Sequence, residues 1–120
     1  MPDRNWWTAL FASVDTKDTP RFLDYLADDA GFRYGSAARV TGKAAIREAV
    51  DTFFASIASS THRIERCWEG SGAAVCEGTV QYVRRDARQV ELPFCNVLAL
   101  ENGRVSDYRI YIDPAPLFAP

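Results

Sequence analysis

The sequence predicts an α+β fold, in which a curved antiparallel sheet packs on one face against three helices from the N-terminal half. Its 120 residues are the usual length of one domain, so we expect a single domain over 1–120. In the first half, apolar residues recur three and four positions apart, as on amphipathic helices. From about residue 60 they alternate with a period of two, and short polar turns separate the runs. Helices followed by strands are typical of α+β proteins.

Two helices are predicted at the start of the chain. Asp3 is suited to cap a first helix whose apolar stripe runs from Trp6 to Val14. Asp18 or Thr19, with Pro20 in the first turn, opens a second short helix. Its apolar positions are Phe22, Leu23, Tyr25 and Leu26. The two helices should pack as a hairpin.

A short strand pair and a third helix come next. The segments 30–35 and 39–42 read as a strand and its return, and Thr41 or Gly42 begins the helix. The apolar side of this helix is formed by Ile46, Val50, Phe53, Phe54 and Ile57.

Four longer strands fill the second half, over 61–69, 73–84, 89–101 and 104–113. The turns between them are short, so consecutive strands should be antiparallel neighbours in a meander. A four-residue loop in the first hairpin would pair Arg66 with Glu77, Cys67 with Cys76 and Ile64 with Thr79. A two-residue turn in the second hairpin would pair Glu77 with Asn96. The same register pairs Thr79 with Phe94. We therefore expect a polar row of Arg66, Glu77 and Asn96 on the otherwise apolar inner face.

The last hairpin can form in two ways. Asn102 and Gly103 suit a two-residue type I′ turn, or a three-residue bulged loop with Gly103 left-handed. The first choice turns Asp107 and Arg109 inward. The second turns an apolar set inward, which consists of Tyr108, Ile110 and Ile112. Burial favours the bulged loop, which brings Tyr108 beside Asn96.

Composition excludes several classes of function. Fourteen Lys and Arg against sixteen Asp and Glu give a net charge of −2, which argues against a nucleic-acid partner. No apolar run is long enough for a membrane span, and MPDRNWW does not resemble a signal peptide, so we expect a cytoplasmic protein away from membranes. Three cysteines without CxxC spacing and a single histidine indicate neither a disulfide framework nor a metal site. We expect no cofactor.

The chain resembles the nuclear transport factor 2-like superfamily, and most closely its SnoaL-like polyketide cyclase and ketosteroid-isomerase-like branch. The resemblance lies in YLADDAGFRYG at 25–35, VTGKAAIREAV at 40–50 and LENGRVSDYRIYID at 100–113. It implies a cone-shaped fold with an apolar pocket between sheet and helices, and frequent dimers through the outer face of the sheet. It also implies that the positions facing the cavity are 77, 79, 96, 108, 110 and 112.

The catalytic residues of known relatives are replaced here. The three catalytic positions of ketosteroid isomerases match Leu10, Tyr34 and Asn96, and none keeps its chemical role, although Asn96 could donate a hydrogen bond to a carbonyl or oxyanion. In the limonene-epoxide-hydrolase pattern, an arginine-x-aspartate strand matches 77–79, and the terminal acid falls on Ile110.

The sequence therefore favours a protein with an internal binding pocket, which acts on a small, mostly apolar molecule that bears a carbonyl or hydroxyl group. As an enzyme it would be an isomerase, cyclase or hydrolase with Glu77 as the titrating group. Arg66 would tune Glu77, and Asn96 with Tyr108 or Tyr34 would orient the ligand. For Glu77 itself, the interpretation as one half of a structural ion pair with Arg66 is about twice as favoured as the interpretation as a catalytic group.

Two interpretations without catalysis stay open: a ligand-binding or dimerisation domain, and a protein-interaction module that uses the outer sheet face.

His62, at the start of a strand, could shuttle a proton as a neutral imidazole or simply be a strand-end residue partly in water.

Overall fold

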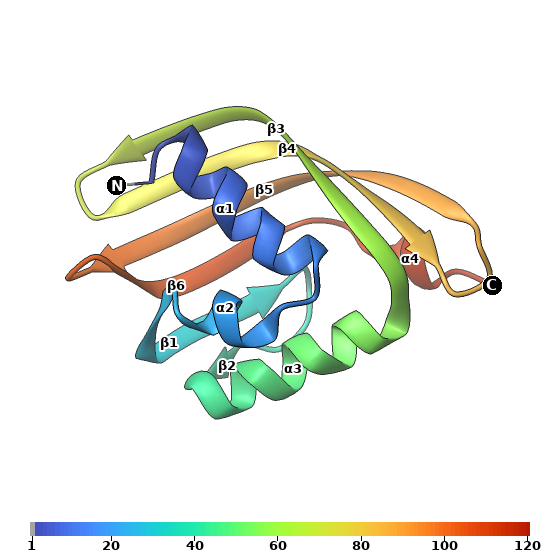
Figure 1. Ribbon diagram of the computed structural model, residues 1–120, viewed down its shortest axis with the longest axis horizontal. Coiled ribbons are helices and arrows are strands. Elements are labelled where there is room, and N and C mark those ends of the chain that lie inside the picture. Colours follow the sequence, from blue (N-terminus) through green and yellow to red (C-terminus); the bar gives the residue numbers. More distant parts are fainter. Residues whose placement is uncertain (1) are drawn as a thin grey trace.

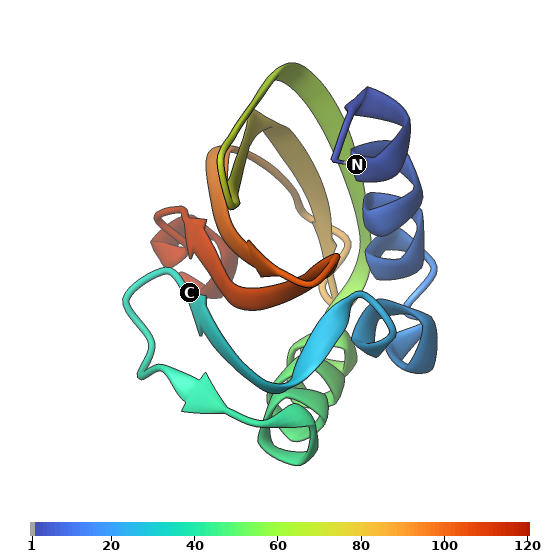
Figure 2. The ribbon, with the colours of Figure 1, turned by 90° about the vertical axis from the view of Figure 1, so that its left-hand side faces the viewer.

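In the computed structural model, which describes residues 2–120, six strands form one curled sheet in the order β2-β1-β6-β5-β4-β3 (Figures 1 and 2). The sheet does not close on itself, and helices cover its concave side (Figure 2). The α+β class is thus confirmed. The helices are α1 (Arg4–Asp15), α2 (Thr19–Leu23), α3 (Lys43–Ser56) and α4 (Ala115–Phe118). The strands are β1 (Leu26–Tyr34), β2 (Val40–Thr41), β3 (Ile57–Gly70), β4 (Ala73–Arg84), β5 (Gln89–Glu101) and β6 (Arg104–Tyr111).

The starts of the first three helices agree with the sequence signals. The Asp3 carboxylate accepts a hydrogen bond from the Trp6 backbone N–H at 2.9 Å, and Asp18 caps α2 in the same way. Gly42, at φ 90°, precedes α3 without a side-chain cap. Helices α2 and α3 end earlier than predicted. The two apolar residues assigned to their ends, Leu26 and Ile57, begin strands instead. Helix α4 was not predicted.

Strands β3 to β6 form the expected antiparallel meander, but β1 pairs with β6 in parallel, with Phe32 beside Tyr108. The sheet is therefore mixed rather than wholly antiparallel. The parallel pair brings the N-terminal half of the chain against the last long strand, so strands from both halves of the chain form the curled sheet (Figure 2).

The predicted register between β4 and β5 is wrong by one residue. Glu77 lies opposite Cys95, and Asn96 lies opposite Cys76. The turn is longer than expected, since the Arg84 backbone N–H donates to the Arg88 carbonyl oxygen at 2.8 Å and Ala87 is left-handed with φ 72°. One extra loop residue turns every side chain of one strand to the other face relative to its neighbour. Glu77 and Asn96 therefore lie on opposite faces of the sheet.

The first hairpin has the predicted pairs Arg66–Glu77 and Cys67–Cys76, followed by a bulge at Glu65. Beyond the bulge, Ile64 pairs with Gly78, so the expected pairing of Ile64 with Thr79 is wrong. A Cβ on Gly78 would collide with the Arg63 carbonyl oxygen, so the bulge requires a glycine at this position.

The last hairpin combines features of both predicted forms. Asn102 and Gly103 have φ 52° and 77° and form a two-residue turn between Glu101 and Arg104, so the expected three-residue loop is wrong. A bulge at Ser106 then shifts the register by one residue. Tyr108 consequently pairs with Leu98 and faces inward, as the burial argument predicted.

None of the helices formed by residues 2–120 has both the length and the apolar character needed to cross a membrane.

Candidate functional site

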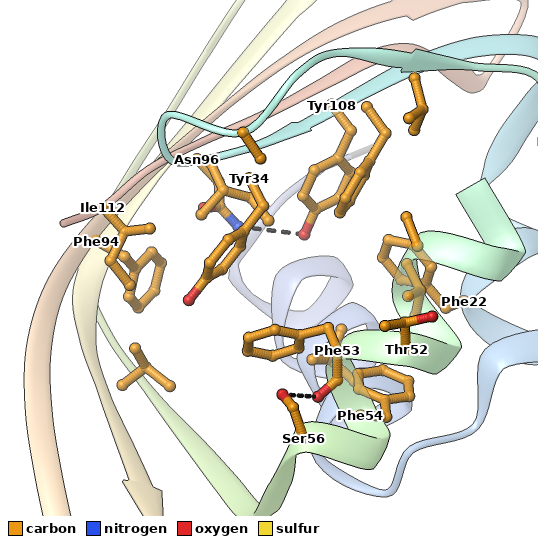
Figure 3. A pocket seen from close by; sticks show the side chains of 18 of the residues that line it. Phe22, Tyr34, Thr52, Phe53, Phe54, Ser56, Phe94, Asn96, Tyr108 and Ile112 are labelled. Atoms are coloured by element: carbon orange, nitrogen blue, oxygen red, sulfur yellow. Dashed lines mark hydrogen bonds between the residues drawn. The ribbon is translucent and has the colours of Figure 1, made fainter. Parts of the chain in front are cut away.

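A cavity of about 350 Å³ lies between the concave face of the sheet and the helices (Figure 3). Its lining is almost entirely apolar, and aromatic rings come from α2, α3, α4, β1, β4, β5 and β6. The aromatic residues in the lining are Phe22, Phe32, Tyr34, Phe53, Phe54, Tyr82, Phe94, Tyr108 and Phe118. Such a space can enclose a small, mostly apolar molecule, and the few polar side chains in its walls determine what chemistry is open to it.

One polar group in the cavity wall is the imidazole of His62. His62 pairs with Val80 in the sheet and turns inward, where its ring stacks on Phe11 with centroids 4.4 Å apart. Its Nδ1 lies 2.6 Å from Oδ1 of Asp15, the last residue of α1. A carboxylate at Nδ1 favours the tautomer that has its proton there, which leaves Nε2 as the basic atom.

The Asp15 carboxylate is held by two further hydrogen bonds. Its Oδ2 accepts from the His62 backbone N–H at 2.9 Å, and its Oδ1 accepts from the Ser60 hydroxyl at 2.8 Å. Helix α1 is fixed against β3 by the Arg4 guanidinium, which donates to the Ile64 carbonyl oxygen at 2.8 Å. These contacts hold the imidazole in one orientation, as a positioned proton-transfer group needs.

Two tyrosine hydroxyls form a second polar group. Tyr34 on β1 and Tyr82 on β4 approach to 3.1 Å between their oxygens. Burial raises the pKa of both hydroxyls above the usual value, while the hydrogen bond with Tyr82 opposes part of the shift for Tyr34. Both therefore stay protonated at neutral pH, and the one hydrogen bond that they share leaves a hydroxyl proton for another acceptor.

Asn96 and Tyr108 form the third polar group (Figure 3). Asn96 Nδ2 donates to the Tyr108 hydroxyl oxygen at 3.1 Å, and both side chains are buried, with 2% and 1% exposure. Burial raises the pKa of the Tyr108 hydroxyl, so it too remains protonated. Among residues 2–120, no group donates to Asn96 Oδ1.

Glu77, the residue that the sequence singled out for catalysis, does not line this cavity. It lies on the outer face of the sheet, where its carboxylate forms an ion pair with the Arg66 Nε at 2.9 Å. Thr79 follows the same alternation and also faces outward. The expected inward placement of Arg66, Glu77 and Thr79 is wrong because the second hairpin has the longer turn. The predicted residues that do line the cavity are Tyr34, Phe94, Asn96, Tyr108, Ile110 and Ile112.

The sequence did not indicate the partnership of His62 with Asp15, because 47 residues separate them and no motif joins them. One signal was present. A carboxylate at the C-terminal end of a helix interacts unfavourably with the helix dipole, so Asp15 at this position indicates a compensating contact elsewhere in the fold. Tyr82 and Val80 were also missed, because the register prediction had turned them outward. Among residues 2–120, no group of three or more His, Cys, Asp or Glu is arranged to hold a metal ion.

The curled sheet packed against N-terminal helices is the fold of nuclear transport factor 2-like structures. The sequence matches the SnoaL-like domain over residues 7–108, and the chain belongs to this family. A search of curated protein sequences finds no match.

Solved structures agree with this fold. A nuclear transport factor 2-like protein of unknown function from Burkholderia pseudomallei superposes with a TM-score of 0.84 at 20% identity, over 92% of this chain and 89% of that one. A putative polyketide cyclase from Xanthomonas campestris gives 0.83 at 16% identity, over 91% and 88%. An LEH-like epoxide hydrolase from M. tuberculosis gives 0.76 at 19% identity, over 92% and 82%. At these identities the likeness concerns the fold.

Proposed function

We propose that this protein is a cofactor-independent acid–base enzyme whose cavity binds a small, mostly apolar molecule bearing a carbonyl or hydroxyl group. The observation that carries the proposal is the 2.6 Å contact between His62 Nδ1 and Asp15 Oδ1 at the wall of an apolar cavity. An imidazole oriented by a carboxylate is a general base suited to neutral pH. Similar folds named as a putative polyketide cyclase and an epoxide hydrolase are consistent with small-molecule chemistry.

In this mechanism His62 Nε2 takes a proton from the bound molecule or from a water beside it, and Asp15 stabilises the imidazolium that forms. The Tyr34–Tyr82 pair supplies a neutral hydroxyl donor for an oxygen on which negative charge develops. The apolar walls exclude bulk water, which strengthens both interactions. Isomerisation, cyclisation and hydrolysis all use these steps. Each reaction is completed when His62 returns the proton to the bound molecule.

The Kemp elimination of 5-nitrobenzisoxazole tests the proposal without knowledge of the natural substrate, because it needs only a base in an apolar cavity. We expect the wild-type protein to accelerate the reaction, and His62→Gln to lower kcat by about 100-fold. Glu77→Gln is the matched control and should keep the wild-type rate, because Glu77 lies on the other face of the sheet. Equal rates for His62→Gln and wild type, or no acceleration by wild type, would overturn the proposal and favour a non-catalytic ligand-binding domain.

The outer face of the sheet is the proposed site for a second copy of the chain. Trp68 and Tyr111 are 49% and 55% exposed there, and between them lie the partly buried Val75, Cys95 and Val97. Large exposed aromatic residues on one face are typical of protein interfaces. The homodimer stays a prediction, as does the cytoplasmic location.

A further inference from the structure

The amide of Asn96 presents an unpaired acceptor on the cavity wall. Its side chain is 2% exposed, and no donor reaches its Oδ1 from residues 2–120. Buried carbonyl oxygens in folded proteins nearly always have a hydrogen-bond partner, because an unpaired one has lost its interaction with water. Asn96 lines the cavity, so the missing donor can come from a bound molecule.

The Tyr108 hydroxyl next to it has the complementary need. Its oxygen accepts from Asn96 Nδ2 at 3.1 Å, and no described residue accepts its proton. Tyr108 also lines the cavity. One hydrogen bond thus joins the two side chains (Figure 3). Asn96 keeps an unused acceptor in its Oδ1, and Tyr108 keeps an unused donor in its hydroxyl proton. A hydroxyl group satisfies both, since it donates one hydrogen bond and accepts another, whereas a carbonyl or an ether only accepts.

The surroundings of the pair suit a planar ring. Phe22 and Phe32 pack on Tyr108 with ring centroids 5.4 and 5.6 Å away, and Phe94 lies two residues from Asn96 on the same face of β5. Flat aromatic walls favour flat ligands, which gain from stacked and edge-on contacts.

We propose that the ligand of this cavity is a planar phenol or enol, whose hydroxyl donates to Asn96 Oδ1 and accepts from the Tyr108 hydroxyl. This inference rests on the proposed function, in that the same bound molecule is the one on which His62 acts. It differs from the role expected for Asn96 from the sequence, because one of the two Nδ2 hydrogens is donated to Tyr108 and the amide atom that has no partner among residues 2–120 is the Oδ1 acceptor.

Calorimetric titration of the wild-type protein with three probes of one shape tests the proposal: 2-naphthol, 2-methoxynaphthalene and 2-naphthaldehyde. We expect 2-naphthol to bind at least tenfold more tightly than the other two, which cannot donate to Asn96. Equal affinities, or a preference for the aldehyde, would overturn the proposal. The aldehyde preference would mean that the amide presents a donor to the cavity. This series needs no variant, so it is decisive even if a substitution at residue 96 prevents folding.

Asn96→Leu assigns the preference to this residue, and Thr79→Val is its control, since it also replaces a polar side chain by an apolar one but faces outward from the same sheet. We expect Asn96→Leu to bind all three probes equally, and Thr79→Val to keep the preference for 2-naphthol. Persistence of the preference in Asn96→Leu would overturn the proposal. These are binding measurements, so a hydroxyl preference without any His62-dependent Kemp elimination would refute the proposed catalysis alone.

Discussion

Asp15 and His62 form a carboxylate–imidazole pair at 2.6 Å that joins the end of α1 to β3. Asp15 accepts three hydrogen bonds from Ser60 and His62 in total, so its substitution should affect both stability and the state of the imidazole.

Asp15→Asn should lower the free energy of unfolding by about 1–3 kcal/mol, because it weakens bonds to a charged acceptor. It should also shift the His62 tautomer away from the Nδ1-protonated form. Urea unfolding measures the first effect. Nitrogen NMR measures the second without ambiguity, because His62 is the single histidine of the chain.

Ser60→Ala is the control for the Asp15 prediction. It removes one hydrogen bond to Asp15 Oδ1 and leaves the contact with the imidazole, so it should reduce stability without changing the tautomer. An unchanged tautomer in Asp15→Asn would show that the carboxylate does not orient the ring.

The buried tyrosines should make the fold sensitive to alkaline pH. Burial raises the pKa of Tyr34, Tyr82 and Tyr108 in the folded state, whereas in the unfolded chain tyrosine ionises near pH 10. Below pH 10 both states hold these protons, and stability does not depend on them. Above about pH 10 the unfolded state binds fewer protons, so the free energy of unfolding should fall by up to about 1.4 kcal/mol per pH unit for each tyrosine.

Denaturant titrations between neutral pH and strongly alkaline pH measure this slope. Tyr82→Phe removes one of the three groups and should reduce the slope by about its share. Ultraviolet absorbance provides an independent reading, since the three hydroxyls should ionise only as the protein unfolds. Ionisation of all tyrosines near pH 10 in a still folded protein would contradict the prediction.

The fold could be predicted from the sequence because it depends on local signals. Asp3, Asp18 and Gly42 mark helix starts, and alternating apolar residues mark the strands. The site could not be predicted to the same degree, because it depends on registers. One extra residue in the turn after Arg84 moved Glu77 to the outer face and brought Tyr82 into the cavity.

The last hairpin shows how burial can correct a wrong turn. The type of loop at Asn102 was predicted wrongly, yet the inward direction of Tyr108 was correct, since a bulge at Ser106 compensates. The Asp15–His62 pair has no such constraint that sequence alone could supply. It arises from the packing of α1 on β3, and only the three-dimensional arrangement reveals it.

The bulge in the first hairpin should be intolerant of any side chain at Gly78. Its Cβ would meet the Arg63 carbonyl oxygen on the neighbouring strand, which is backbone and cannot move aside cheaply. Gly78→Ala should therefore lower the free energy of unfolding by about 1–3 kcal/mol. Gly70→Ala is the matched control, because nothing lies within 4 Å of a Cβ at that position. Equal stabilities of the two variants in urea unfolding would show that the strands can part at the bulge without cost.

The proposed dimer predicts that a charge added to the outer face, on its edge strand β3, will separate the copies. Trp68 is half exposed on that face, beneath the Arg66 guanidinium, which lies 5.9 Å from its ring centroid. Trp68→Arg should weaken self-association at least tenfold, since it removes a large apolar contact and adds a second cation beside Arg66. Glu48→Arg, an exposed change on α3 and outside the sheet, should leave the dimer intact. Sedimentation equilibrium of both variants measures the effect, and a wild-type protein that stays monomeric at all concentrations would refute the dimer.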